Sequence, residues 1–141
     1  IEMARKLKAE KIAYRIMILD KKKKLQSDAI EVISKPMPLA EVNQCIANAK
    51  AVIDFHREKQ NGLTFRVFES LRARKKLTTT NPDIKNYDFF NPDNIHVIEN
   101  DEFTISKTFF ETPYAPIPEE IYQKYTLDGW IKAVLNLKTK T

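Results

Sequence analysis

The sequence predicts an α+β protein of one domain, mostly helical (three to five helices), with a small antiparallel β-hairpin or sheet in its C-terminal half. Three observations indicate this fold class. An apolar period of three and four residues runs from position 38 to 62, helix formers fill residues 1–24, and β-branched and aromatic residues alternate between positions 94 and 110. A chain of 141 residues is long enough to bury one core without disulfides or metal ions.

The first 24 residues are predicted to form a basic helix that either packs on the domain or projects from it. We expect this helix to end at Lys21–Lys24, where four like charges repel one another. The following segment, residues 26–35, is ambiguous. Asp28 and Glu31 resemble a helix capping pair, whereas the β-branched residues around them favour a strand, and the prediction leans towards helix.

The segment from Pro38 to Gly62 is the strongest helix prediction in the chain. Proline suits a first helical position, and Asn-Gly suits a helix end. The residues that recur at helical spacing and define the apolar stripe are Leu39, Val42, Ile46, Ala49, Ile53 and His56. A helix of this length is about 30 Å long at ~1.5 Å per residue, so it sets the distance between the basic segments on either side of it.

Further helices are predicted on both sides of the hairpin. Thr64 is expected to cap a helix that continues to the Thr-rich segment before the first of two Asn-Pro-Asp turns. Pro118 is expected to begin another helix that runs through Tyr125. The Thr-Leu-Asp-Gly segment at 126–129 breaks this helix, and the apolar residues from Trp130 to Leu137 form the last one.

The antiparallel hairpin is predicted from two β-rich runs, residues 94–100 and 102–110, that meet at Asn100-Asp101. Two strands alone are marginally stable, so a third strand is expected from residues 29–33 or 63–68.

The composition narrows the class of protein. Two glycines in the whole chain argue against glycine-rich phosphate loops and Rossmann turns, and Cys45, the single cysteine, has no partner for an internal disulfide. We find no signal-peptide pattern and no apolar run long enough for a transmembrane helix. These features predict a protein of the cytoplasm, or of the nucleus in a eukaryote, without membrane association.

The charge is divided into blocks along the chain. Residues 1–24 hold nine Lys and Arg against three acidic residues, a net charge of +6, and residues 57–76 hold seven against two, a net charge of +5. Residues 77–120 hold two lysines against nine acidic residues, a net charge of −7. Such asymmetry is typical of proteins with a polyanionic partner.

The leading functional hypothesis is therefore a non-enzymatic accessory protein that contacts the phosphates of DNA or RNA. From the composition we expect an accessory protein of a phage or mobile element. Two basic tracts carry the candidate nucleic-acid contacts. They comprise Arg5, Lys6, Lys8, Lys11, Arg15, Lys21, Lys22, Lys23 and Lys24 in the first tract, and Arg66, Arg72, Arg74, Lys75 and Lys76 in the second.

An alternative is a protein-interaction module, an adaptor or an inhibitor, and the sequence leaves a homodimer open. The candidate partner-binding residues lie in the acidic block and combine aromatic with acidic side chains. They are Tyr87, Phe89, Asp93, Asp101 and Glu102.

A third hypothesis is a metal-dependent nuclease, which needs several carboxylates and a lysine around a metal ion. Asp83, Lys85, Asp93, Glu99 and Glu102 are the residues of that kind, but their order does not reproduce a known nuclease pattern. The two histidines, His56 and His96, lack the spacing of a metal site. No cofactor, metal site or catalytic residue is predicted.

Overall fold

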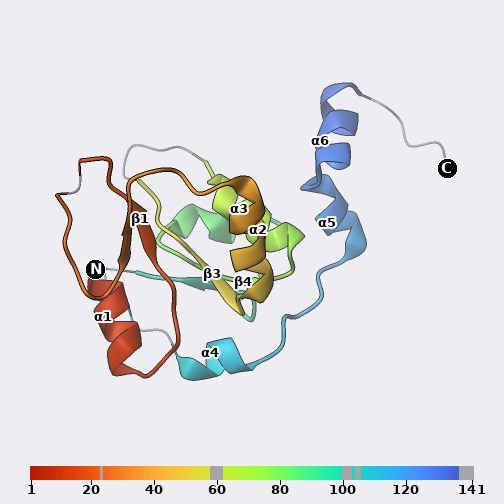
Figure 1. Ribbon diagram of the computed structural model, residues 1–141. Helices are drawn as coiled ribbons and strands as arrows, with labels where there is room; N and C mark the ends of the chain where they lie inside the picture. Colours follow the sequence, from red (N-terminus) through yellow and green to blue (C-terminus); the bar gives the residue numbers. More distant parts are fainter. Residues whose placement is uncertain (23, 58–61, 100–102, 104–105, 137–141) are drawn as a thin grey trace.

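The computed structural model describes residues 1–22, 24–57, 62–99, 103 and 106–136 (Figure 1). These residues form six α-helices, one 3₁₀ helix and five strands. In chain order the elements are α1 (Glu2–Ala9), β1 (Met17–Leu19), β2 (Glu31–Ile33), α2 (Leu39–Asn48), β3 (Ala51–Asp54), α3 (Phe65–Arg72), β4 (Lys76–Thr79), η1 (Pro82–Asn86), β5 (Ile95–Val97), α4 (Lys107–Glu111), α5 (Glu119–Lys124) and α6 (Leu127–Val134).

The strands form two parallel sheets. β1 pairs with β2, and a central sheet has the order β3-β4-β5, with Val52 opposite Leu77 and Leu77 opposite Ile95. In Figure 1, α1 and the β1–β2 pair lie on one side of the central sheet, and α5 and α6 extend away on the other.

The predicted antiparallel hairpin is wrong. Its first half does contain a strand, β5, but β5 pairs with β4 in parallel, and part of its second half forms α4. Neither expected third strand joins a hairpin, since residues 31–33 pair with β1 and residues 65–68 begin α3. β5 forms its interstrand hydrogen bonds with β4, about 20 residues earlier in the chain, and not with the segment that directly follows it. The helix count of three to five is also too low for the residues described.

The predicted central helix is wrong over its second half. α2 ends at Asn48, Ala49 is extended with ψ 150°, and the Ala-Val-Ile-Asp segment that follows is β3. Val52 and Asp54 are buried within this strand. Apolar side chains occur on both faces of this short strand, at Ala51, Val52 and Ile53, so they continued the helical period of α2 by coincidence.

The N-terminal helix is shorter than predicted. α1 ends at Ala9, and residues 17–19 form a strand that pairs with residues 31–33. The preference of residues 26–35 for a helix was therefore also wrong, and the β-branched residues there form β2. α1 packs on the domain, because Met3 and Leu7 are buried in a cluster with Ile98.

Three predicted helices are present, two of them with different bounds. α3 follows Thr64 but ends at Arg72, and Lys76–Thr79, predicted to continue this helix and end it, form β4. α5 follows Pro118, and α6 begins at Leu127 within the segment predicted to break the helix, because the hydroxyl of Thr126 accepts a hydrogen bond from the backbone N–H of Gly129. The main core lies between α3 and the central sheet, where Val67 and Leu71 pack with residues of all three strands and of η1.

α1 and α3 end in the same way. Each is followed by a residue in the left-handed conformation, Lys11 with φ 55° and Arg74 with φ 51°. The next backbone N–H bonds to a carbonyl five residues earlier, from Ile12 to Leu7 and from Lys75 to Ser70. This pattern is the Schellman motif, in which glycine is the usual left-handed residue.

Candidate functional site

Buried polar side chains gather at the carboxyl edge of the central sheet, where β3 and β4 end. Asp54 closes β3 and is 4% exposed, and Thr79 closes β4 and is fully buried. The hydroxyl of Thr79 donates to Oδ2 of Asp54 at 2.8 Å, and the hydroxyl of Thr64 donates to Oδ1 at 2.6 Å. One carboxylate therefore joins the ends of two strands to the residue that precedes α3.

The loops that leave this edge are held by further polar bonds. Asn81, 1% exposed, donates through its side chain to the carbonyl of Gly62 at 3.3 Å and accepts from the backbone N–H of Asp83. The backbone N–H of His56 donates to the hydroxyl of Thr80 at 2.8 Å. The Nδ1 atom of His56 is buried and has no hydrogen-bond partner within the described residues.

The first turn of α3 starts at the same edge. No side-chain hydrogen bond caps this helix, and the hydroxyl of Thr64 donates to Asp54. The first backbone N–H groups of a helix have no partner within it, and together they carry a partial positive charge. Arg66 adds a full charge in this turn and forms an ion pair with Glu69 at 2.6 Å.

The first basic tract lies on α1 and the segment after it, and α1 packs against Ile98, which directly follows β5. On and after α1 its cations are exposed, and several have acidic neighbours: Lys6 lies 3.7 Å from Glu2, Lys8 lies 3.6 Å from Asp28, and Arg15 binds both oxygens of Glu31. The hydrogen bond from Arg15 lowers the pKa of the Glu31 carboxyl. Arg5 and Lys11 are exposed as well.

The rest of the first tract forms a loop between β1 and β2. The carboxylate of Asp20 accepts hydrogen bonds from the backbone N–H groups of Lys22, Lys24 and Leu25, at 2.7–3.0 Å. Lys21, Lys22 and Lys24 are exposed, whereas Lys23 falls outside the described residues. Asp20 thus fixes the backbone from which these lysines extend.

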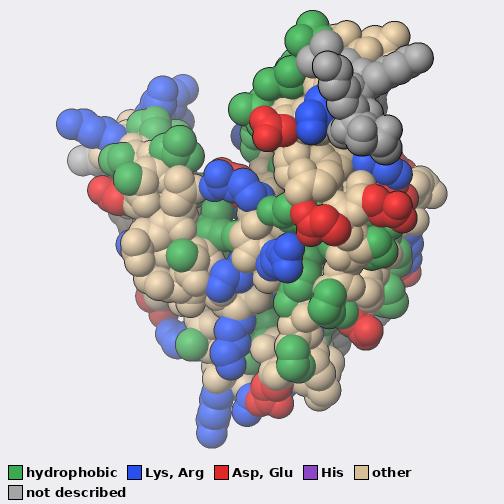
Figure 2. All heavy atoms as spheres, turned by 90° about the vertical axis from the view of Figure 1, so that its right-hand side faces the viewer, with side chains coloured by type: hydrophobic (Ala, Val, Ile, Leu, Met, Phe, Trp, Pro, Cys, Tyr) green, Lys and Arg blue, Asp and Glu red, His purple; other side chains and the backbone are tan. Residues whose placement is uncertain are grey.

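α3 divides the second basic tract between the two edges of the sheet. Arg66 lies at the carboxyl edge, whereas Arg72, Arg74, Lys75 and Lys76 lie at the amino edge, where β4 begins. Figure 2 shows Lys and Arg side chains gathered in the middle of the face towards which α5 and α6 extend.

Most of the basic side chains at the amino edge bond to other groups of the protein. Arg72 donates to Oδ1 of Asn43 at 3.4 Å, and Lys75 donates to the carbonyl of Ala47 at the end of α2. Arg74 lies 3.5 Å from Glu119 and over the ring of Tyr122.

Lys76 differs from its neighbours because it is 3% exposed. Its ammonium group donates to the carbonyl of Phe109 at 2.6 Å and to the hydroxyl of Thr112. Burial lowers the pKa of this ammonium group, although the negative charge of Asp93 opposes that effect. Lys76 fastens α4 to the sheet and presents no charge to solvent.

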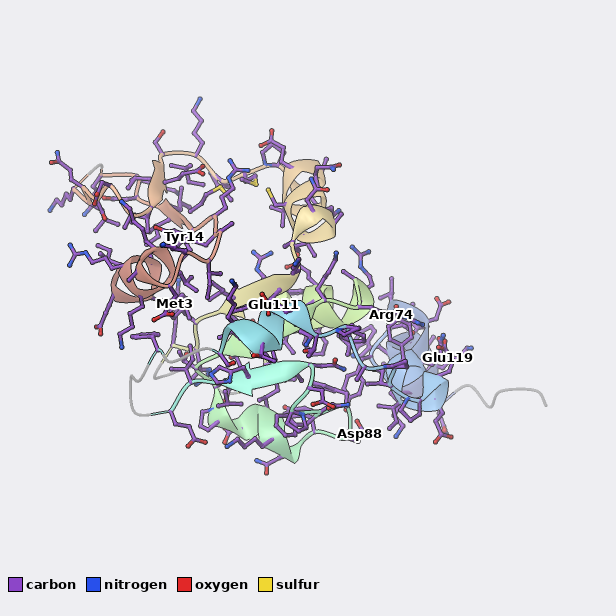
Figure 3. All side chains as sticks on the ribbon, turned by 90° about the horizontal axis from the view of Figure 1, so that it is seen from below. Met3, Tyr14, Arg74, Asp88, Glu111 and Glu119 are labelled. Carbon is purple, nitrogen blue, oxygen red and sulfur yellow. The ribbon has the colours of Figure 1, made fainter. Side chains whose placement is uncertain are left out.

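The two basic tracts do not form one surface. One continuous basic surface would require the N-terminal helix to fold back along a long central helix, and α2 has only ten residues. In Figure 3, Met3 and Tyr14 lie at one end of the molecule, while Arg74 and Glu119 lie at the other.

The candidate partner-binding residues are also separated. Phe89 is 2% exposed and packs edge-on against Tyr125 with ring centres 4.7 Å apart, and Tyr87 is half-buried beside it. Asp93 is exposed, and Asp101 and Glu102 lie outside the described residues. A different acidic residue, Asp88, bonds to Lys124 and Tyr125, and these hydrogen bonds lower the pKa of its carboxyl.

Among the described residues, no three His, Cys, Asp or Glu side chains lie close enough together to hold a metal ion. Of the nuclease candidates, Glu99 pairs with Lys85, Asp83 and Asp93 are exposed, and Glu102 lies outside the described residues.

A groove of about 180 Å³ lies between α3 and the α5–α6 corner. Its walls are mainly aromatic and apolar and include Phe65, Phe68, Tyr122, Tyr125 and Leu127. Phe65 and Leu127 are 87% and 71% exposed, so both are open to solvent at the groove.

Sequence reasoning missed the carboxyl edge, although a local signal exists. Asp54 directly follows the short apolar run of β3, and Thr79, Thr80 and Asn81 close the run that contains Leu77. Polar residues at the end of short apolar runs are typical of the ligand-binding edge of a parallel sheet. Because residues 51–54 were predicted to be helical, Asp54 was not identified as the polar end of a strand.

No described helix has the length and apolar character to cross a membrane. Comparisons of the chain with protein-family models, with curated proteins and with solved structures gave no match.

Proposed function

We propose that the protein binds a phosphorylated small molecule of the nucleotide class at the carboxyl edge of β3-β4-β5. In open parallel sheets, ligands bind outside the carboxyl ends of the strands, because the loops and helix starts that carry recognition groups meet there. The β3–α3–β4 segment is such a unit, with one helix between two paired parallel strands.

The observation that carries this proposal is the convergence of buried polar side chains at that edge. Asp54, Thr79 and Asn81 are each at most 4% exposed, and they come from β3, β4 and the segment after β4. Burying polar groups is costly unless each is bonded, and here the bonds position the start of α3. The carboxylate accepts from hydroxyls of the protein, so the N–H groups of Phe65 and Arg66 at the start of α3 can bind an anion, whereas the N–H of Val67 donates to the carbonyl of Thr64.

Arg66 is the side chain expected to contact the phosphate. It lies in the first turn of α3, and a guanidinium group can donate two hydrogen bonds to a phosphate. The neighbouring groove, whose aromatic walls begin at Phe65, has a surface suited to the planar base of a nucleotide.

Isothermal titration calorimetry with ADP, UDP and inorganic phosphate tests the proposal. We expect binding of at least one nucleotide, and a loss of affinity of about 10-fold in Arg66→Gln, as is typical when a charged hydrogen bond is removed. Arg74→Gln is the matched control, since it removes the same charge from the amino edge. The proposal is wrong if no nucleotide binds the folded protein, or if the two variants lose affinity equally.

A second candidate function is phosphate contact with nucleic acid through the lysine loop between β1 and β2. The observation that favours it is the backbone of this loop, where Asp20 accepts hydrogen bonds from the N–H groups of Lys22, Lys24 and Leu25 while Lys21, Lys22 and Lys24 are exposed to solvent. Such lysines bind by displacing counterions, so affinity falls steeply with salt.

A filter-binding assay with random duplex DNA and RNA at several salt concentrations tests this second function. Replacing Lys21, Lys22 and Lys24 with Gln is expected to reduce the slope of log K against log salt by about 0.9 for each phosphate that the loop no longer neutralises. An unchanged slope, or no binding by the wild type at low salt, contradicts it. Arg66→Gln separates the two functions, because only nucleotide binding depends on Arg66.

A further inference from the structure

α6 exposes an apolar surface that no other described element covers. Leu127, Trp130, Val134 and Leu135 are 59–71% exposed, and none of them belongs to either core cluster. Figure 1 shows α6 extending from the body of the protein, and Figure 2 shows hydrophobic side chains along one edge of it. Residues 127, 130, 131 and 134 recur at helical spacing, so they form one stripe, and Leu127 joins this stripe to Phe65 at the groove.

The direction of α6 is fixed by its junction with α5. The hydroxyl of Thr126 donates to the carbonyl of Gln123 at 2.8 Å and accepts from the N–H of Gly129. Gly129 itself fits closely against α5, because a Cβ atom there would lie 1.9 Å from the carbonyl oxygen of Gln123. The stripe is therefore held away from the core in a defined orientation. An apolar patch presented in this way usually marks an interface with another protein.

The sequence of α6 is complementary to itself. Asp128 and Lys132 lie on the same flank of the stripe, two residues before and two residues after Trp130. If two such helices cross antiparallel at Trp130, a two-fold axis brings the same flanks together and places Asp128 of each copy opposite Lys132 of the other. In the same arrangement, Leu127 of one helix lies near Val134 of the other.

We propose that α6 is a homodimer interface, in which the α6 helices of two copies pair antiparallel about Trp130. Two helices of eight residues bury less than the ~800 Å² per partner of a standard interface, so we expect a weak dimer. In the proposed dimer, the neighbouring groove at Phe65 adds to the buried area. The paired charges fix the antiparallel register, which apolar contact alone does not specify.

Sedimentation equilibrium of the full chain from 1 to 200 µM, concentrations chosen to bracket a weak dimer, tests this interface. The wild type is expected to pass from monomer to dimer, and Trp130→Glu is expected to stay monomeric with an unchanged circular dichroism spectrum. Trp130 lies outside both core clusters, so this variant should keep the fold. A wild type that is monomeric throughout, or a Trp130→Glu variant that still dimerises, overturns the proposal.

Charge reversal distinguishes this pairing from nonspecific association. Asp128→Lys and Lys132→Asp each place like charges opposite one another, so each dissociation constant is expected to rise about 10-fold or more. An equimolar mixture of the two variants restores both attractive pairs and should dimerise as well as the wild type. If the mixture associates no better than either variant alone, the antiparallel two-fold pairing is wrong.

Discussion

The two edges of the central sheet use polar residues in opposite ways. At the carboxyl edge, Asp54 and Thr79 are buried and bond to side chains of neighbouring segments. At the amino edge, Lys75 and Lys76 donate to carbonyl groups, Arg74 pairs with an exposed glutamate, and Arg72 donates to Asn43.

This difference shows why a count of basic residues is a poor guide to a binding surface. Lys75 donates to Ala47 at the carboxyl end of α2, where a cation is favoured because the helix dipole is negative there. The dense basic run before β4 is therefore explained largely by helix ends and by the attachment of α4. The polar residues of the carboxyl edge are fewer, but they position a helix start that has no cap.

The largest effect on stability is expected from Asp54→Ala at the carboxyl edge. The substitution leaves the buried hydroxyl of Thr79 without its acceptor and separates Thr64 from β3, so it should cost about 2–4 kcal/mol in the free energy of unfolding. Urea denaturation measures this cost, with Lys75→Ala as the amino-edge control. Equal losses in the two variants would remove the distinction between the edges.

An intermediate effect that depends on pH is expected from Lys76→Met. Burial lowers the pKa of Lys76 below its ordinary value of 10.5, so between the folded and unfolded pKa values the unfolded chain binds the extra proton. The free energy of unfolding of the wild type should therefore rise with pH in that window, by roughly 1.4 kcal/mol for each pH unit that separates the two pKa values, and Lys76→Met should lack this rise.

Denaturation of the wild type and of Lys76→Met at several pH values up to 10 measures the difference between their free energies of unfolding. The other titrating groups contribute equally to both proteins, so they cancel in this difference. Parallel pH profiles would show that Lys76 titrates as an exposed lysine does.

The smallest effect is expected from Arg74→Gln. The ion pair with Glu119 joins two side chains that are about 60% exposed, and such pairs contribute less than about 1 kcal/mol. Thermal unfolding should show a shift of at most a few degrees that disappears in 0.5 M salt. A loss as large as that of Asp54→Ala would mean that the amino edge is a structural centre in its own right.

The helices with complete local signals could be predicted from the sequence. α3 has an apolar side and a threonine before it, and the apolar residues from Trp130 predicted α6, although the cap at Thr126 that begins it was interpreted as a break. The parallel sheet could not be predicted, because its pairs join residues 51–54 to 76–79 and 77–79 to 95–97. Nothing within a short window of sequence records such distant partners.

The candidate site could not be predicted either, because it is formed by the pairing of β3 with β4. Asp54 and Thr79 are 25 residues apart, and only the register of β3 with β4 brings their side chains together. Lys76 was grouped with Arg74 and Lys75 because it follows them in the sequence. Its position as the first residue of a buried strand, where side chains alternate between the two faces, turns it inward beneath α4.

The left-handed residues after α1 and α3 indicate where the chain can be made more heat-resistant. A side chain with a Cβ atom in this conformation costs roughly 1 kcal/mol relative to glycine, and neither of the two glycines of the chain is used at these helix ends. Lys11 is exposed, so Lys11→Gly should raise the melting temperature. Arg74→Gly removes the same backbone strain but also loses the interactions with Glu119 and Tyr122. Lys11, after α1, is therefore the better position for a stabilising substitution.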